Sequence, residues 1–139
     1  MGFPTNCLRG LAKGKWVIDG LVSAAAFEPD NRTIKTRADR LAEISINWED
    51  DGRAFEALAE SKEALHGVAR LSLQDIEYVR KKAPRLNVLQ YERDKIDGND
   101  YHGNLLLDGD MPPALRTMLM NSLALHARLA TGPIEDAQT

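Results

Sequence analysis

A chain of 139 residues is long enough for one domain, and a formal charge of -3 excludes a protein whose whole surface attracts nucleic acid or an anionic membrane. Apolar residues make up 43% and charged residues 28%, which excludes disorder along the whole chain. Cys7 is the only cysteine, so no internal disulfide or all-cysteine metal site is expected, and no window approaches the ~20 apolar residues of a membrane span. We expect one cytoplasmic domain, residues 1–139, that does not enter a membrane.

The first 42 residues predict an irregular N-terminal region that packs onto a sheet or folds against a partner. Within it, KWVIDGLVS (Lys15–Ser23) predicts a short strand or hairpin, because the pair Asp19 and Gly20 tolerates the positive φ of tight turns. AAAF then predicts a brief helical turn that ends by Pro29. Residues 30–40, DNRTIKTRADR, predict a solvated loop.

Regular structure is predicted from EISINWED onward. Ile44, Ile46 and Trp48 alternate with polar residues, which is typical of a half-buried strand. Residues 50–67, DDGRAFEALAESKEALHG, predict a helix with two aspartates at its start and Gly67 as its C-terminal cap.

A second strand over residues 67–73 leads into another predicted helix. Ser72 and Asp75 have the spacing of a capping box, and Pro84 disfavours helical geometry in the residue before it. Residues 87–93, NVLQYER, predict a third strand. HGNLLL, residues 102–107, predicts a fourth, and its continuous apolar run indicates burial on both faces.

The segment PPALRTMLMNSLALHARLA, residues 112–130, predicts the last helix, with an apolar stripe that reaches Leu129. Because this helix is apolar on more than one side, we expect it at the centre of the core or in a homodimer interface. The tail, residues 133–139, is expected to fray. The order of the elements predicts an α+β domain with a small mixed β-sheet and about three helices packed against it.

The stretch DGNDYHGNLLLDGD, residues 97–110, holds several aspartates that offer oxygen ligands to a hard cation. The spacing does not match a calcium-binding loop, however, and Asp-Gly and Asn-Asp pairs are turn formers. No two histidines have the spacing of a zinc-binding helix. We therefore predict no metal site and no cofactor.

Two residues are the candidate catalytic residues. His102 stands where a polar connection becomes an apolar strand, and a histidine there can act as a general acid or base. Arg9 can hold a phosphate or carboxylate through its planar guanidinium, and Lys13 and Lys15 stand close by. The glycines around them lack the order of a phosphate-binding P-loop.

The remaining reactive residues have simpler explanations. Cys7 has no histidine near it in sequence, so we expect a small buried residue rather than a nucleophile. His66 is expected at a helix C-terminus, where it meets the helix dipole, and His126 at the boundary of the core. The basic residues between 80 and 85 suit a solvated helix end, which makes nucleic acid an unlikely partner.

The sequence does not determine the function. The leading hypothesis is a small cytoplasmic protein-binding or regulatory accessory domain, with a protein partner or a homo-oligomer. The alternative is a small hydrolase or transferase for a phosphate-containing or nucleotide-like substrate, with Arg9 holding the anion and His102 as acid or base. The two hypotheses differ in what they require of the structure, because only the second needs Arg9 and His102 close together.

Overall fold

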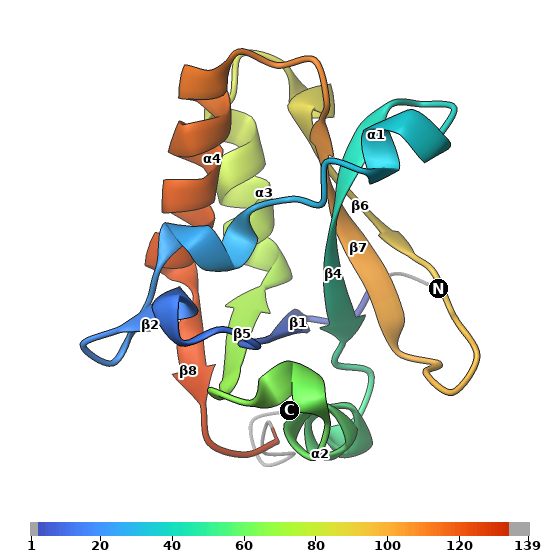
Figure 1. Cartoon of the computed structure of the whole chain (residues 1–139), viewed down its shortest axis with the longest axis vertical. Coiled ribbons are helices and arrows are strands. Elements are labelled where there is room, and N and C mark those ends of the chain that lie inside the picture. The colour runs from blue at the N-terminus through green and yellow to red at the C-terminus, as the bar shows by residue number, and fades with distance from the viewer. Residues whose placement is uncertain (1–2, 134–139) are drawn as a thin grey trace.

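An antiparallel sheet of six strands, in the order β6-β7-β4-β1-β5-β8, organises the computed structural model, which describes residues 3–133 (Figure 1). Its strands are β1 (Asn6–Gly10), β4 (Leu41–Trp48), β5 (Val68–Ser72), β6 (Leu89–Arg93), β7 (His102–Asp108) and β8 (Arg128–Ala130). A separate hairpin is formed by β2 (Val17–Ile18) and β3 (Leu21–Val22). The α-helices are α1 (Thr33–Thr36), α2 (Gly52–Ala59), α3 (Leu73–Lys82) and α4 (Pro113–His126). Short 3-10 turns are η1 (Gly14–Trp16), η2 (Ala24–Phe27), η3 (Lys62–Ala64) and η4 (Leu86–Val88).

The predicted α+β fold is confirmed, and α2, α3 and α4 are the three longer helices. The sheet is antiparallel throughout rather than mixed. The reason lies in β1, which pairs with β4 on one side and with β5 on the other. The strands that α2 connects therefore run parallel but are not neighbours.

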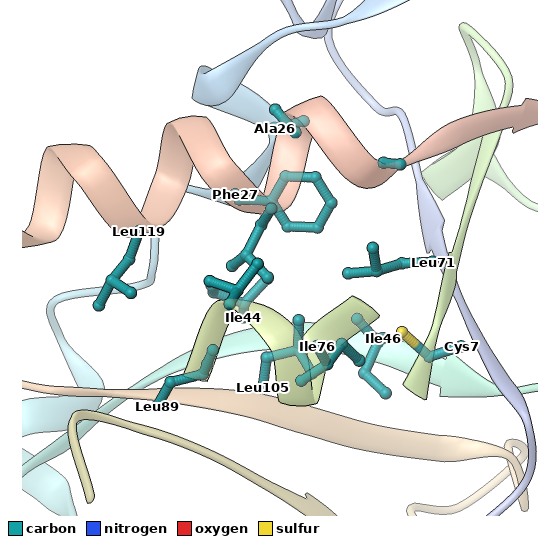
Figure 2. Packing of buried hydrophobic residues seen from close by; sticks show 14 of the residues in the cluster. Cys7, Ala26, Phe27, Ile44, Ile46, Leu71, Ile76, Leu89, Leu105 and Leu119 are labelled. Carbon is teal, nitrogen blue, oxygen red and sulfur yellow. The ribbon is translucent and has the colours of Figure 1, made fainter. Parts of the chain in front are cut away.

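The main core lies between one face of the sheet and the helices α3 and α4, which run side by side (Figure 1). Phe27 enters this core from η2, Ile76 from α3 and Leu119 from α4, and they meet Ile44 and Leu105 from the sheet (Figure 2). Each of these side chains is at most 1% exposed, and full burial of a side chain of this size contributes roughly 1.5–3 kcal/mol. A smaller cluster of α2 with Leu8 and Val68 covers part of the opposite face.

The expectation of an irregular region over residues 1–42 misses β1, which lies in the middle of the sheet. Cys7 and Leu8 are at most 1% exposed, on opposite faces, and Asn6 is 7% exposed, so this strand is buried over only three residues. The hairpin prediction is confirmed, since Asp19 and Gly20 have φ values of 53° and 76° between β2 and β3. Residues 30–40, expected to form a loop, contain the single turn α1.

Helix starts agree with the predictions better than helix ends. Asp51 caps α2 by accepting from the backbone N–H of Arg53 at 2.9 Å, and Ser72 caps α3 by accepting from that of Asp75 at 3.0 Å. The helix expected over residues 50–67 ends at Ala59, with Glu60 rather than Gly67 as its C-terminal cap.

The last predicted helix is also too long. It stops at His126, and the three residues of β8 pair with β5 as the edge strand of the sheet. Of the predicted tail, residues 134–139 lie outside the described residues.

Candidate functional site

The candidate site lies where β1 separates from β4. These strands pair only at two positions, Cys7 with Trp48 and Leu8 with Asn47, although β1 runs on to Gly10. The side chain of Arg9 occupies the gap that opens. Its Nη1 donates to the carbonyl oxygen of Ser45 at 2.7 Å, and its Nε donates to that of Ala26 at 2.9 Å. Arg9 therefore joins β1, β4 and η2 where strand pairing is lost.

The guanidinium of Arg9 is partly buried and has no carboxylate within 4.0 Å among the described residues. Its central carbon lies 4.7 Å from the ring centroid of Trp16. Burial lowers the pKa of Arg9 to about 10, against the opposing effect of the nearby Glu63 carboxylate, and the side chain stays protonated at neutral pH. Nη2 has no hydrogen-bond partner in the described part of the chain, so the cation keeps binding capacity.

His102 is the first residue of β7 and is paired with Asn47 of β4. Its Nδ1 lies 2.8 Å from the backbone carbonyl oxygen of Asp94. Because a carbonyl only accepts hydrogen bonds, Nδ1 carries the proton of the neutral ring and Nε2 keeps its lone pair. The side chain is 15% exposed, and within residues 3–133 its Nε2 has no partner. The ring is thus oriented by one nitrogen and available through the other.

Both candidate residues line one cavity of about 310 Å³, together with Ser45, Asn47 and Glu63. Asn47 is only 7% exposed, and its Oδ1 accepts a hydrogen bond of 2.7 Å from Asn99 in the β6–β7 connection. The Nδ2 of Asn47 makes no hydrogen bond with any described residue. An almost buried amide donor is therefore left for whatever occupies the cavity.

The polar groups that face this cavity are mainly donors. Arg9 and Asn47 offer N–H groups, Ser45 offers a hydroxyl that makes no hydrogen bond within the described chain, and Glu63 is the one carboxylate of the lining. Cys7 is not part of the lining, since its side chain is in the core and burial raises its pKa to about 12. The arrangement suits the binding of an anion better than nucleophilic catalysis.

The other residues considered from the sequence are engaged in local contacts. Asp108 pairs with Arg85 and Asp110 with Arg40, and the described residues contain no group of three or more histidine, cysteine or acidic side chains placed to hold a metal ion. Arg80 pairs with Glu77, at the end of α3 that was expected to be solvated.

Two histidines lie elsewhere than the candidate cavity. His66 lies against Gly14 and not at the end of a helix, which corrects its expected position, because α2 ends before it. The ring of His126 packs edge-on to that of Tyr78, and its Nδ1 lies 3.7 Å from Oδ1 of Asp75.

Sequence reasoning missed Asn47 and Ser45. Their only signal is alternation in β4, where every second residue is polar, and that pattern is equally typical of a strand face in contact with water. Ser45 is exposed, and the burial of Asn47 involves Asn99, 52 positions away in the sequence, which the pattern does not report.

Comparison with models of protein families, with curated proteins and with solved structures finds no match for this chain. Among the described residues, no helix has the length and apolar character needed to span a membrane. The geometry of the site is therefore the basis for a functional proposal.

Proposed function

We propose that the protein binds a small anionic molecule, a carboxylate or a phosphate, in the cavity lined by Arg9 and His102. The observation that carries this proposal is the set of unused donors that face one cavity: Nη2 of Arg9, Nδ2 of Asn47 and the hydroxyl of Ser45. These donors make no hydrogen bond within the described chain, so a ligand that accepts from them adds hydrogen bonds without breaking any in the protein.

Charge supports the same ligand class. The guanidinium of Arg9 is partly buried and has no carboxylate within 4.0 Å in the described chain, so an anion placed on Nη2 gains a charge-assisted hydrogen bond. Nε2 of His102 accepts from a hydroxyl of the ligand when the ring is neutral. Glu63 disfavours a second negative charge on its side of the cavity. We assign no chemical step to the site, and we propose the cytoplasm as its compartment.

Asn47→Asp is the variant that tests the proposal. It keeps the oxygen that accepts from Asn99 and replaces the free amide donor by a carboxylate oxygen. We expect calorimetric titration with orthophosphate and with acetate, at constant ionic strength, to show binding by the native chain of at least one anion. We expect at least tenfold weaker binding by the variant, which corresponds to about 1.4 kcal/mol.

The matched control is Asn87→Asp, which adds the same charge on η4, away from the cavity lining. It should bind as the native chain does. Arg9 is unsuitable for this test because its hydrogen bonds also hold β1, β4 and η2 together. Absence of binding by the native chain, or equal binding by Asn47→Asp, would overturn the proposal.

A second function, the binding of a protein partner or of another copy of the chain, is favoured by one surface of exposed leucines. Leu21 is 71% exposed, Leu125 75% and Leu129 40%, and they border an apolar pocket of about 220 Å³ beside the edge strand β8. Contiguous apolar surface of this kind marks interaction sites. Leu125 was expected on the buried stripe of the last helix, but the buried residues of α4 are Leu119, Leu123 and Ala124.

Light scattering over a range of protein concentrations tests self-association through this surface. Leu125→Glu should shift a self-associating chain to the monomer, whereas Leu65→Glu, at an isolated position that is 73% exposed, should not. If the chain is monomeric at every concentration, binding of a hydrophobic dye tests the surface instead. We expect Leu65→Glu to bind as much dye as the native chain does and Leu125→Glu to bind less. Equal dye binding by all three would argue against this function.

A further inference from the structure

A second cavity adjoins the candidate site and shares part of its lining. This cavity, of about 580 Å³, shares Arg9, Trp16 and Ser45 with the first. Its lining adds the ammonium groups of Lys13 and Lys15. The two cavities therefore adjoin at Arg9, Trp16 and Ser45, and both lysines belong to the second.

The positive charges of Arg9, Lys13 and Lys15 are not balanced by direct ion pairs within the described chain. Lys13 and Lys15 are exposed, and neither has a carboxylate within 4.0 Å among residues 3–133. In the same lining, Asp30 is paired with Arg32, and Glu43 shares the guanidinium of Arg37 with Asp39 and Glu92. The lining of this second cavity holds four basic and three acidic residues, although the whole chain carries a formal charge of -3.

Trp16 keeps two of these cations near each other. The guanidinium carbon of Arg9 lies 4.7 Å from the ring centroid, and Nζ of Lys13 lies 5.8 Å from it. Each cation is attracted by the ring, but the cations repel one another. A negative charge near both cations offsets this repulsion. A ligand with one negative group in each cavity offsets it more than a ligand with only one negative group.

Resting on the proposed function, we propose that the ligand is a diphosphate or phosphate ester with two linked anionic groups, one at Arg9 and Asn47 and the other at Lys13 and Lys15. The two groups bind in adjoining cavities, so the linkage between them passes Trp16. Once the first group is bound, the second binds intramolecularly, which raises the affinity above that for a single anion.

Pyrophosphate and orthophosphate are the probes that test this inference, each titrated by calorimetry at constant ionic strength. We expect pyrophosphate to bind at least tenfold more tightly than orthophosphate. The double variant Lys13→Gln/Lys15→Gln should lose this preference and bind orthophosphate within about twofold of the native chain. The matched control, Lys81→Gln/Lys82→Gln on α3, removes the same charge away from both cavities and should keep the preference.

The outcomes separate the two proposals. Equal affinity for the two probes would overturn the second anionic group and leave the site at Arg9 and Asn47 in place. A preference for pyrophosphate that survives Lys13→Gln/Lys15→Gln, or that the α3 control also loses, would overturn the placement of the second group. If neither probe binds, the phosphate class is wrong, and the proposed function then depends on the acetate titration and on the effect of Asn47→Asp on it.

Discussion

The guanidinium of Arg9 donates to the carbonyl oxygen of Ser45 at 2.7 Å, across the gap where β1 and β4 stop pairing. In a continuous sheet that carbonyl would accept from a backbone N–H of the neighbouring strand. Here a side chain takes the place of the backbone, and it bonds to Ala26 of η2 as well. The same residue thus closes the sheet and faces the candidate cavity.

Arg9→Met should lower the free energy of unfolding by about 2–4 kcal/mol. The substitution removes the charged donor from the carbonyl oxygen of Ala26, in a partly buried bond, and from that of Ser45, in an exposed one. Each lost hydrogen bond to a charged group costs roughly 1.5–3 kcal/mol before water enters. Urea unfolding followed by circular dichroism measures the effect. Arg9→Lys keeps the charge but cannot donate from two nitrogens at once. Its free energy of unfolding should lie between those of the native chain and Arg9→Met. A loss under about 0.5 kcal/mol for Arg9→Met would show that the bonds to Ser45 and Ala26 do not hold the gap together.

Gly103→Ala should destabilise the fold by about 3 kcal/mol. The indole of Trp48 crosses β7 at Gly103 to donate from Nε1 to the carbonyl oxygen of Glu92 at 3.0 Å. A methyl group at Gly103 would collide with that indole nitrogen and with the carbonyl oxygen, and the carbonyl belongs to a paired strand that cannot move freely. The control is Gly132→Ala, where an added methyl group meets nothing within 4 Å. Thermal unfolding of both variants compares the two sites, and equal midpoints would contradict the prediction.

Arg37 should make the protein resistant to acid. Its guanidinium binds Asp39, Glu43 and Glu92 and joins the α1–β4 connection to β4 and β6. Hydrogen bonding to Arg37 lowers the pKa of Asp39 to about 2 and also lowers the pKa of Glu92. For a carboxyl group with a lowered pKa, the stabilisation is present above its unfolded value near 4 and is lost as the pH falls toward the folded value.

Arg37→Gln should therefore unfold at a higher pH than the native chain in an acid titration followed by circular dichroism. At neutral pH it should also lose about 1–3 kcal/mol, because three carboxylates remain together without their cation. Arg32→Gln is the matched control, since Arg32 pairs with Asp30 on the surface and is 91% exposed. If Arg37→Gln and the native chain unfold at the same acid pH, Arg37 does not contribute to stability in acid.

The fold was predictable from the sequence where one pattern extends over several residues. Ile44, Ile46 and Trp48 define β4 by alternation, and the run Leu105–Leu107 is buried on both faces as expected. The strand β1 escaped prediction because its burial depends on pairing with β4 and β5, whose positions are set by the rest of the chain. Local composition reports burial on one face of an element, but not which elements become neighbours.

The candidate site was predictable only in part. Arg9 and His102 were selected for their chemistry, and the fold brings both to one cavity. The hydrogen bond from Arg9 to Ser45 had no signal in the sequence, since it joins residues 36 positions apart. The alternation in β4 is typical of a solvated strand face and gave no reason to single out Asn47. In the fold, however, Asn47 is 7% exposed and accepts a hydrogen bond from Asn99.

An ion pair that the sequence did not indicate supplies the last prediction. Glu49, whose side chain is fully buried, accepts from Nε and Nη2 of Arg70 at 2.8 and 2.7 Å, and Nη2 of Arg70 also donates to the carbonyl oxygen of Gly132 at 2.8 Å. Arg70→Met removes the guanidinium that the buried Glu49 carboxylate binds, and breaking a buried ion pair from one side costs about 3–5 kcal/mol.

The double variant Glu49→Gln/Arg70→Met should regain part of that loss, because it replaces the buried carboxylate by a neutral amide, which is less costly to bury. Urea unfolding of the two single variants and the double variant forms a thermodynamic cycle, and we expect the double variant to be more stable than Arg70→Met. If the two single losses simply add, the carboxylate of Glu49 gains nothing from Arg70. The contact would then matter only for packing against Phe55, whose ring centroid lies 5.9 Å from the guanidinium carbon.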